Sequence, residues 1–101
     1  IEHLERFGKS KIAVLEVLYE EKRPMAADEI TTLIREKRIG KNNGKVSNKH
    51  VGSSLRDYLD MNLVKRITLD PSERQGSKTR FVYEITENGK ASINRYRRMM
   101  K

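Results

Sequence analysis

One stretch of the chain brings together side chains of the types that catalyse nucleophilic reactions. His50 precedes Ser53 and Ser54 by three and four residues. Asp57 follows the histidine by seven residues. A serine hydroxyl, an imidazole base and an orienting carboxylate can act together as a catalytic triad. At these spacings all the groups would project outward from one helix, without a cleft or an oxyanion hole. We therefore expect no enzyme activity here.

Other patterns that support chemistry are also missing from the sequence. The chain has no Cys, which excludes disulfides and thiol chemistry. Its two His, His3 and His50, are too few for a histidine-ligated metal centre, and the carboxylates show no metal-ligand spacing. Residues 40–46 contain two glycines but lack the terminal Lys-Ser/Thr of a phosphate-binding loop. We expect no cofactor, no metal and no small-molecule ligand.

The basic side chains are concentrated in two segments of this 101-residue chain. The whole chain has a formal net charge of +8, with 22 Lys and Arg against 14 Asp and Glu. Residues 37–69 carry eight basic and two acidic side chains, and residues 90–101 carry five basic and no acidic ones. Such segregation indicates an anionic partner, most often nucleic acid and less often an acidic membrane surface. No apolar run approaches the roughly 20 residues that cross a bilayer, and no signal peptide is evident.

Apolar residues recur at helical spacing in three segments of the first two thirds of the chain. They predict helices over 11–22, 27–38 and 48–61. Between the last two, residues 40–45 are rich in Gly and Asn and predict a loop. The expected helix starts and stops are Ser10, Ser47, Asn62 and Thr86. Hydrophobic residues make up 36% of the chain, which is enough to form one small core.

A β-hairpin and a fourth helix are predicted after the third helix. Residues 63–67 and 79–85 read as strands, separated by a turn-rich segment over 70–77. A last helix is expected from residue 87 to the end, although Gly89 should weaken its first turn. The order is therefore helix, helix, helix, hairpin, helix, which is an α+β arrangement.

The third predicted helix has the side chains that read base edges in DNA. At about 100° per residue, Lys49, Ser53 and Arg56 point away from the apolar side, with Asn48 and His50 at the entry. Arg and Lys donate to guanine, Asn pairs with adenine, and Ser adapts to either. A charged outer face that is simply solvated is the alternative interpretation of this pattern.

Three stretches resemble winged helix-turn-helix regulators of the PadR and MarR types. Residues 24–30 (PMAADEI) look like the short strand and second-helix start of that family. Residues 46–66 look like its recognition helix running into the wing, and 83–90 (YEITENGK) like the second wing strand and the entry to a C-terminal helix. The connection between helices two and three is about eight residues, longer than the three or four of the plain motif.

The resemblance implies one winged-helix domain over 1–101, with an N-terminal extension (1–9), a core (10–85) and a C-terminal helix (86–101). It implies a cytoplasmic transcriptional regulator that binds double-stranded DNA sequence-specifically, nucleoid-associated if the source is prokaryotic. The third helix would lie in the major groove and the wing on the backbone or minor groove. Backbone contacts are expected from Lys41, Asn43 and Lys45 in the loop and from Arg74, Gln75, Lys78 and Arg80 in the wing. The alternative is a winged-helix protein-docking module of a larger nucleic-acid-associated assembly.

Apolar residues at both ends of the chain predict a homodimer. The expected interface comprises Leu4, Phe7, Ile93, Tyr96, Met99 and Met100. A two-fold pair of third helices would match two DNA half-sites about 34 Å apart. On this interpretation, a chain truncated before Lys90 should fold as a monomer.

The first prediction is therefore that the intact chain is a dimer at micromolar concentration. Sedimentation or light scattering measures its mass directly. A clean monomer with the C-terminal helix in place would refute the dimer.

Overall fold

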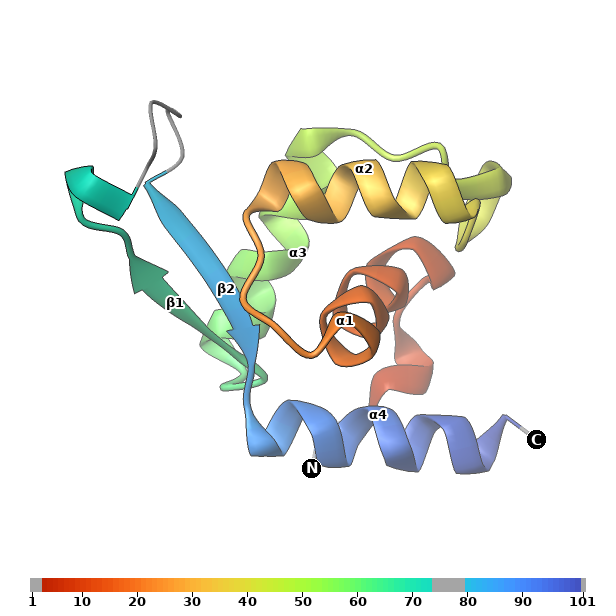
Figure 1. Ribbon diagram of the computed structural model, residues 1–101. Helices are drawn as coiled ribbons and strands as arrows, with labels where there is room; N and C mark the ends of the chain where they lie inside the picture. The colour runs from red at the N-terminus through yellow and green to blue at the C-terminus, as the bar shows by residue number, and fades with distance from the viewer. Residues whose placement is uncertain (1–2, 74–79, 101) are drawn as a thin grey trace.

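Four helices and a two-stranded hairpin surround one core in this computed structural model, which describes residues 3–73 and 80–100 (Figure 1). The α-helices are α1 (Lys9–Glu21), α2 (Ala27–Lys37), α3 (Asn48–Asp60) and α4 (Glu87–Met99). The strands are β1 (Val64–Thr68) and β2 (Phe81–Ile85), and short 3-10 helices span Leu4–Arg6, Lys41–Gly44 and Pro71–Glu73. The predicted order of elements is confirmed, and the structured turn over Lys41–Gly44 lies where a loop was expected.

Helix α1 begins earlier than predicted. Its N-cap is Gly8, whose carbonyl accepts hydrogen bonds from the backbone N–H groups of Lys11 and Ile12, both at 3.1 Å. The prediction of Ser10 as the cap was wrong, because Ser10 already lies inside the first turn. The helix is enclosed on more than one side, and its buried residues are Ile12, Ala13, Val14, Leu15, Val17 and Leu18.

The other predicted helix starts and stops are confirmed. The Ser47 hydroxyl accepts from the N–H of His50 at 3.0 Å at the start of α3. The Thr86 hydroxyl accepts from the N–H of Gly89, also at 3.0 Å, at the start of α4. Each bond satisfies one of the N–H groups that a helix leaves free in its first turn. Asn62, just past α3, takes a left-handed conformation with φ 60°.

The hairpin packs one face against the helices. Strands β1 and β2 are antiparallel, with Val64 opposite Ile85 and Lys65 opposite Glu84. Val64 and Ile85 are buried, so alternation along the strands places Lys65 and Glu84 on the outer face. Met25 adds a bridge to Tyr83, with hydrogen bonds in both directions at 2.9 and 2.8 Å. This bridge confirms the short strand expected before the second helix.

Gly89 has a role that differs from the weakening expected of a glycine in a helix. A Cβ at this position would lie 2.2 Å from the carbonyl oxygen of Leu63 and 2.6 Å from Cγ1 of Ile85. That same carbonyl accepts from the N–H of Thr86 at 3.0 Å. Only glycine therefore lets α4 approach the start of the wing closely enough for this bond.

The two ends of the described chain belong to the same core as its middle. Leu4 and Ile93 have no exposed surface, and Phe7 packs edge-on against Tyr58 with ring centroids 6.2 Å apart. Truncation before Lys90 would remove Ile93 from this core, so the structure does not favour the expectation that the truncated chain folds as a monomer. Leu4 and Ile93 are also already buried within their own chain, so neither is free to line a subunit interface.

The second prediction concerns Gly89. Replacing it with Ala should destabilise the fold by at least about 2 kcal/mol, because the added methyl overpacks against backbone. Gly52→Ala is the matched control: it is also a helical glycine, but a Cβ there meets nothing within 4 Å. We expect that control to gain about 0.5–1 kcal/mol. Urea unfolding of both variants measures the difference, and equal effects would contradict the close approach at Leu63.

Candidate nucleic-acid interface

The outer face of α3 carries basic side chains that no carboxylate neutralises. Lys49, Ser53 and Arg56 are all exposed, as predicted from the helical spacing. Among residues 3–73 and 80–100, the side chains of Lys49 and Arg56 form no hydrogen bond and no ion pair. Gly52 lies between them, and a Cβ there would meet nothing within 4 Å. Because Gly52 has no side chain, another surface can approach the helix backbone closely at this point.

The two residues at the entry to α3 lie on its flanks. Asn48 is exposed, so its amide is accessible. His50 is only half-exposed, and its Nε2 atom is enclosed without a hydrogen-bond partner in the part of the chain that the structure describes. The structure therefore brings Lys49, Ser53 and Arg56 onto one face but does not bring the His50 ring nitrogen onto it.

Tyr58 positions α3 against α1. Its side chain is fully buried, and its hydroxyl donates to the carbonyl oxygen of Lys11 at 2.5 Å. Burial raises the pKa of the Tyr58 phenol well above its ordinary value, with the carboxylates of Glu16 and Asp57 adding to the shift. The ammonium of Lys11 reaches Asp57 on α3 at 2.6 Å. These contacts fix the helix from behind its exposed face.

A basic hollow of about 770 Å³ lies beside the N-terminus of α3. Its lining residues are Arg35, Arg38, Asn43, Gly44, Lys45, Val46 and Ser47, which include three cations and no carboxylate. The Arg35 guanidinium donates to the carbonyl of Val46 through Nε at 3.0 Å and through an Nη at 2.6 Å. The N-terminus of a helix already favours anions, so the hollow is suited to a phosphate.

The backbone around this hollow is held in an unusual conformation. Gly44 has φ 82°, and a Cβ there would lie 2.4 Å from the carbonyl oxygen of Ile34. Arg38 and Asn43 are left-handed as well, with φ 52° and 57°. A left-handed arginine costs of order 1 kcal/mol and persists only when its surroundings fix it. The loop between α2 and α3 therefore has a specific backbone conformation, and its tight turn requires glycine at position 44.

The predicted backbone contacts are only partly described by the structure. Asn43 and Lys45 line the basic hollow, and Arg80 is exposed at the start of β2. Arg74, Gln75 and Lys78 lie outside the described residues, as does the side chain of Lys41. Sequence reasoning missed Arg35 and Arg38. Arg38 belongs to the basic segment 37–69, which could have indicated it, but Arg35 lies outside that segment on a helix with balanced charge.

Most cations in the second basic segment are neutralised within the chain. Lys90 pairs with Glu87 at 3.3 Å and Arg95 with Glu5 at 3.0 Å. Arg97 contacts the carboxylates of Glu16 and Glu20 on α1 and lies over the Tyr19 ring. Within the described part of this segment, only Arg98 has no such partner. Most of the charge of residues 90–101 is therefore matched within the chain, by Glu87 of α4 itself, by Glu5 of the N-terminal turn and by two glutamates of α1.

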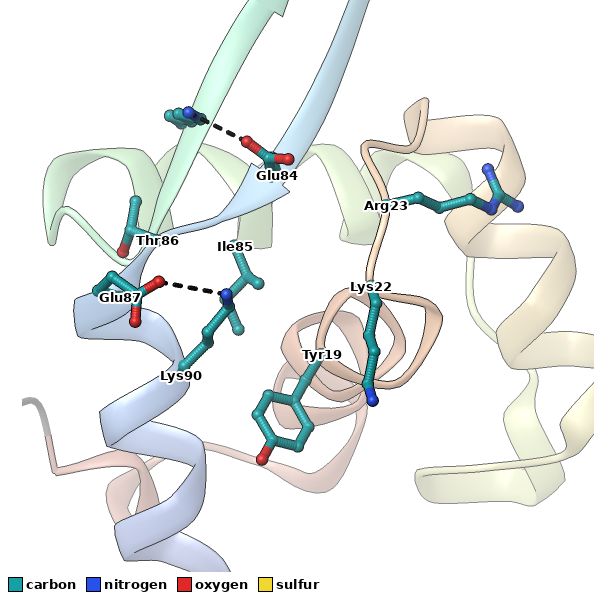
Figure 2. Close-up of a pocket in the computed structure, with 9 residues that line it drawn as sticks. Tyr19, Lys22, Arg23, Glu84, Ile85, Thr86, Glu87 and Lys90 are labelled. Atoms are coloured by element: carbon teal, nitrogen blue, oxygen red, sulfur yellow. Dashed lines mark hydrogen bonds and ion pairs between the residues drawn. The ribbon is translucent and has the colours of Figure 1, made fainter.

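A second cleft, of about 570 Å³, lies where the end of α1, the base of the wing and the start of α4 meet (Figure 2). Its charged walls form ion pairs, Lys65 with Glu84 at 3.0 Å and Lys90 with Glu87. The Thr86 hydroxyl on its wall is already engaged, since it donates to the Asn62 carbonyl at 2.7 Å. None of the residues lining this cleft forms a nucleophile–base pair.

Within residues 3–73 and 80–100, no three His, Asp or Glu side chains come together as a metal site. None of the helices described is long and apolar enough to cross a membrane.

The fold is that of a winged-helix protein: three helices, a hairpin wing and a fourth helix packed beneath them. No family model and no curated protein matches the sequence. Two solved structures share the fold. The reduced form of the transcriptional regulator YodB from B. subtilis is 21% identical, with a TM-score of 0.65, over 89% of this chain and 72% of that one.

The other is a PadR family transcription regulator from hypervirulent Clostridium difficile. It is also 21% identical, with a TM-score of 0.69, and the match covers 89% of this chain and 84% of that one. The fold class inferred from the three sequence stretches is confirmed by these two likenesses. Both neighbours are transcription regulators rather than enzymes.

The third prediction concerns the buried hydroxyl that positions α3. Tyr58→Phe should cost about 1 kcal/mol of stability at neutral pH, because the hydrogen bond to Lys11 is lost. The folded state keeps the phenol protonated, whereas in the unfolded chain it ionises near pH 10. The stability that Tyr58 contributes is therefore present below pH 10 and is lost as the pH rises further.

Urea unfolding of both proteins at neutral and alkaline pH measures this. Tyr19→Phe is the control, because its hydroxyl donates to Asn94 on the exposed surface. The alkaline loss of stability should be smaller in Tyr58→Phe than in the unmodified chain. The same pH dependence in both would contradict the role of Tyr58.

Proposed function

We propose that this chain binds double-stranded DNA sequence-specifically as a transcriptional regulator, with α3 in the major groove. The observation that carries the proposal is the pattern of charge compensation. The outward cations of α3 and the adjoining hollow have no carboxylate partner, whereas most cations of α4 do. An anionic partner would supply the negative charge that these cations lack. DNA is such an anion, and its major groove admits an exposed α-helix.

The side chains divide into two roles. Lys49, Ser53 and Arg56 face outward on α3, where Lys and Arg donate to guanine edges and Ser adapts to its partner. Arg38 and Lys45, in the hollow at the start of α3, bind a backbone phosphate and set the position of the helix in the groove. Such a protein acts where the DNA is, inside the cell.

A homodimer remains part of this proposal, on a smaller set of residues than the sequence indicated. Met99 and Met100 are 51% and 61% exposed and are the large hydrophobic side chains most open to solvent among the described residues. Tyr96 is half-exposed on the same helix. An exposed apolar end of α4 suits a contact with a second copy, which would pair two α3 helices for two half-sites.

The fourth prediction separates base reading from general attraction. Arg56→Ala or Lys49→Ala should weaken a selected site by roughly 1–3 kcal/mol more than random DNA, because a base contact is lost. Lys45→Ala should weaken both about equally and reduce the slope of log affinity against log salt by about 0.9. Shift assays over a range of salt, with selected and random duplexes, measure both quantities.

Arg98→Ala is the matched control, since it removes an exposed, uncompensated arginine from α4 rather than α3. We expect it to leave both affinities nearly unchanged. Affinity that does not vary with salt would refute the electrostatic mode of binding. Equal losses on both duplexes for Arg56→Ala would make Arg56 a phosphate contact only.

One observation favours the alternative of a protein-docking module. Ile67 lies opposite Val82 on the outer face of the wing, and both are half-exposed. This patch suits an apolar partner, but α3 has no comparable apolar residue on its outer face. A chain that binds a protein through the wing and shows no affinity for DNA at low salt would support the alternative.

A further inference from the structure

The inner face of the wing carries a positioned guanidinium that the sequence did not single out. Arg66 follows Val64 by two residues on β1, so both lie on the same face of the sheet. Val64 is buried in the same core cluster as Leu55 and Tyr58 of α3, so this face of the sheet is turned toward the helices. Arg66 is one step farther along that face, where it is exposed.

Phe81 holds this guanidinium in place. The Arg66 Cζ atom lies 4.5 Å from the centroid of the Phe81 ring, which projects from β2 on the same face. Stacking uses one face of the planar group and leaves its N–H donors free at the edge. No carboxylate among the described residues pairs with Arg66. Lys65, its neighbour on the outer face, is instead paired with Glu84 at 3.0 Å.

The two faces of the wing therefore differ in whether their cations are paired with carboxylates. The outer face is neutralised at its base by the Lys65–Glu84 pair, while the inner face presents an uncompensated guanidinium on the side of α3. In Figure 1 β1 begins near the end of α3, after three intervening residues, and the two elements are in contact. A duplex that receives α3 brings its backbone close to this inner face.

We propose that Arg66, stacked on Phe81, binds a DNA phosphate beside the groove that α3 occupies. This proposal rests on the proposed DNA binding and adds a contact at the base of the wing. A planar guanidinium with free edge donors matches the two oxygens of a phosphate, and stacking reduces the freedom lost on binding.

The fifth prediction compares two adjacent cations on opposite faces of one strand. Arg66→Ala should weaken binding to a random duplex roughly tenfold at low salt, the loss expected for one charge-assisted hydrogen bond. It should also lower the salt slope by about 0.9. Lys65→Ala removes the same charge from the outer face and should change neither quantity appreciably. Fluorescence anisotropy over a salt series measures both.

Two further variants test the role of the stack. Arg66→Lys keeps the charge but not the planar group, so it should retain the salt slope while losing part of the affinity. Phe81→Leu should lose affinity with the charge still present. Thermal unfolding, followed by circular dichroism, verifies that each variant is folded before its binding is compared.

The outcomes separate this inference from the proposed function. If the unmodified chain binds no DNA, the proposed function fails. If it binds, and Arg66→Ala matches Lys65→Ala in affinity and slope, DNA binding stands and the role of Arg66 is overturned. If Arg66→Ala alone loses affinity and slope, the inner-face contact is supported.

Discussion

The arrangement of α3, the wing and α4 depends on one buried residue, Leu63. Its N–H donates to the carbonyl of Tyr58 at the end of α3, at 2.8 Å, and its own carbonyl accepts from Thr86, where the wing ends and α4 begins. Gly89 leaves room for that carbonyl. Because three elements meet at the backbone of one residue, a shift of α4 would move the base of the wing and the end of α3 together.

Charge compensation distinguishes cations that hold the fold from cations that are open to a partner. Arg95 and Arg97 are matched by glutamates of the N-terminal turn and of α1, so they join segments about 75 to 90 residues apart in the sequence. Exposed pairs of this kind each contribute little to stability, typically below about 1 kcal/mol. Their main effect here is to neutralise α4, which leaves the uncompensated charge of α3, the adjoining hollow and the inner wing as the basic surface.

That surface is built on supports of different kinds. Helix α3 is fixed by the buried Tyr58 hydroxyl, the hollow by the tight turn at Gly44, and Arg66 by an aromatic ring. Each support restricts a side chain or a backbone segment before any partner arrives. Groups held in this way lose less conformational freedom on binding than free surface side chains do. This smaller loss of conformational freedom suits a surface that recognises a rigid partner such as a duplex.

The sequence by itself determined the elements and one face of the interface. Helical spacing placed Lys49, Ser53 and Arg56 outward, and local capping chemistry identified Ser47 and Thr86, because both depend on residues within one or two turns. Only the tertiary structure decided that residues 90–101 are largely neutralised, that Leu4 and Ile93 lie in the core, and that Arg66 stacks on Phe81. These features depend on contacts between residues that are distant in the chain. A local sequence pattern does not predict which distant charge or ring will lie beside a given side chain.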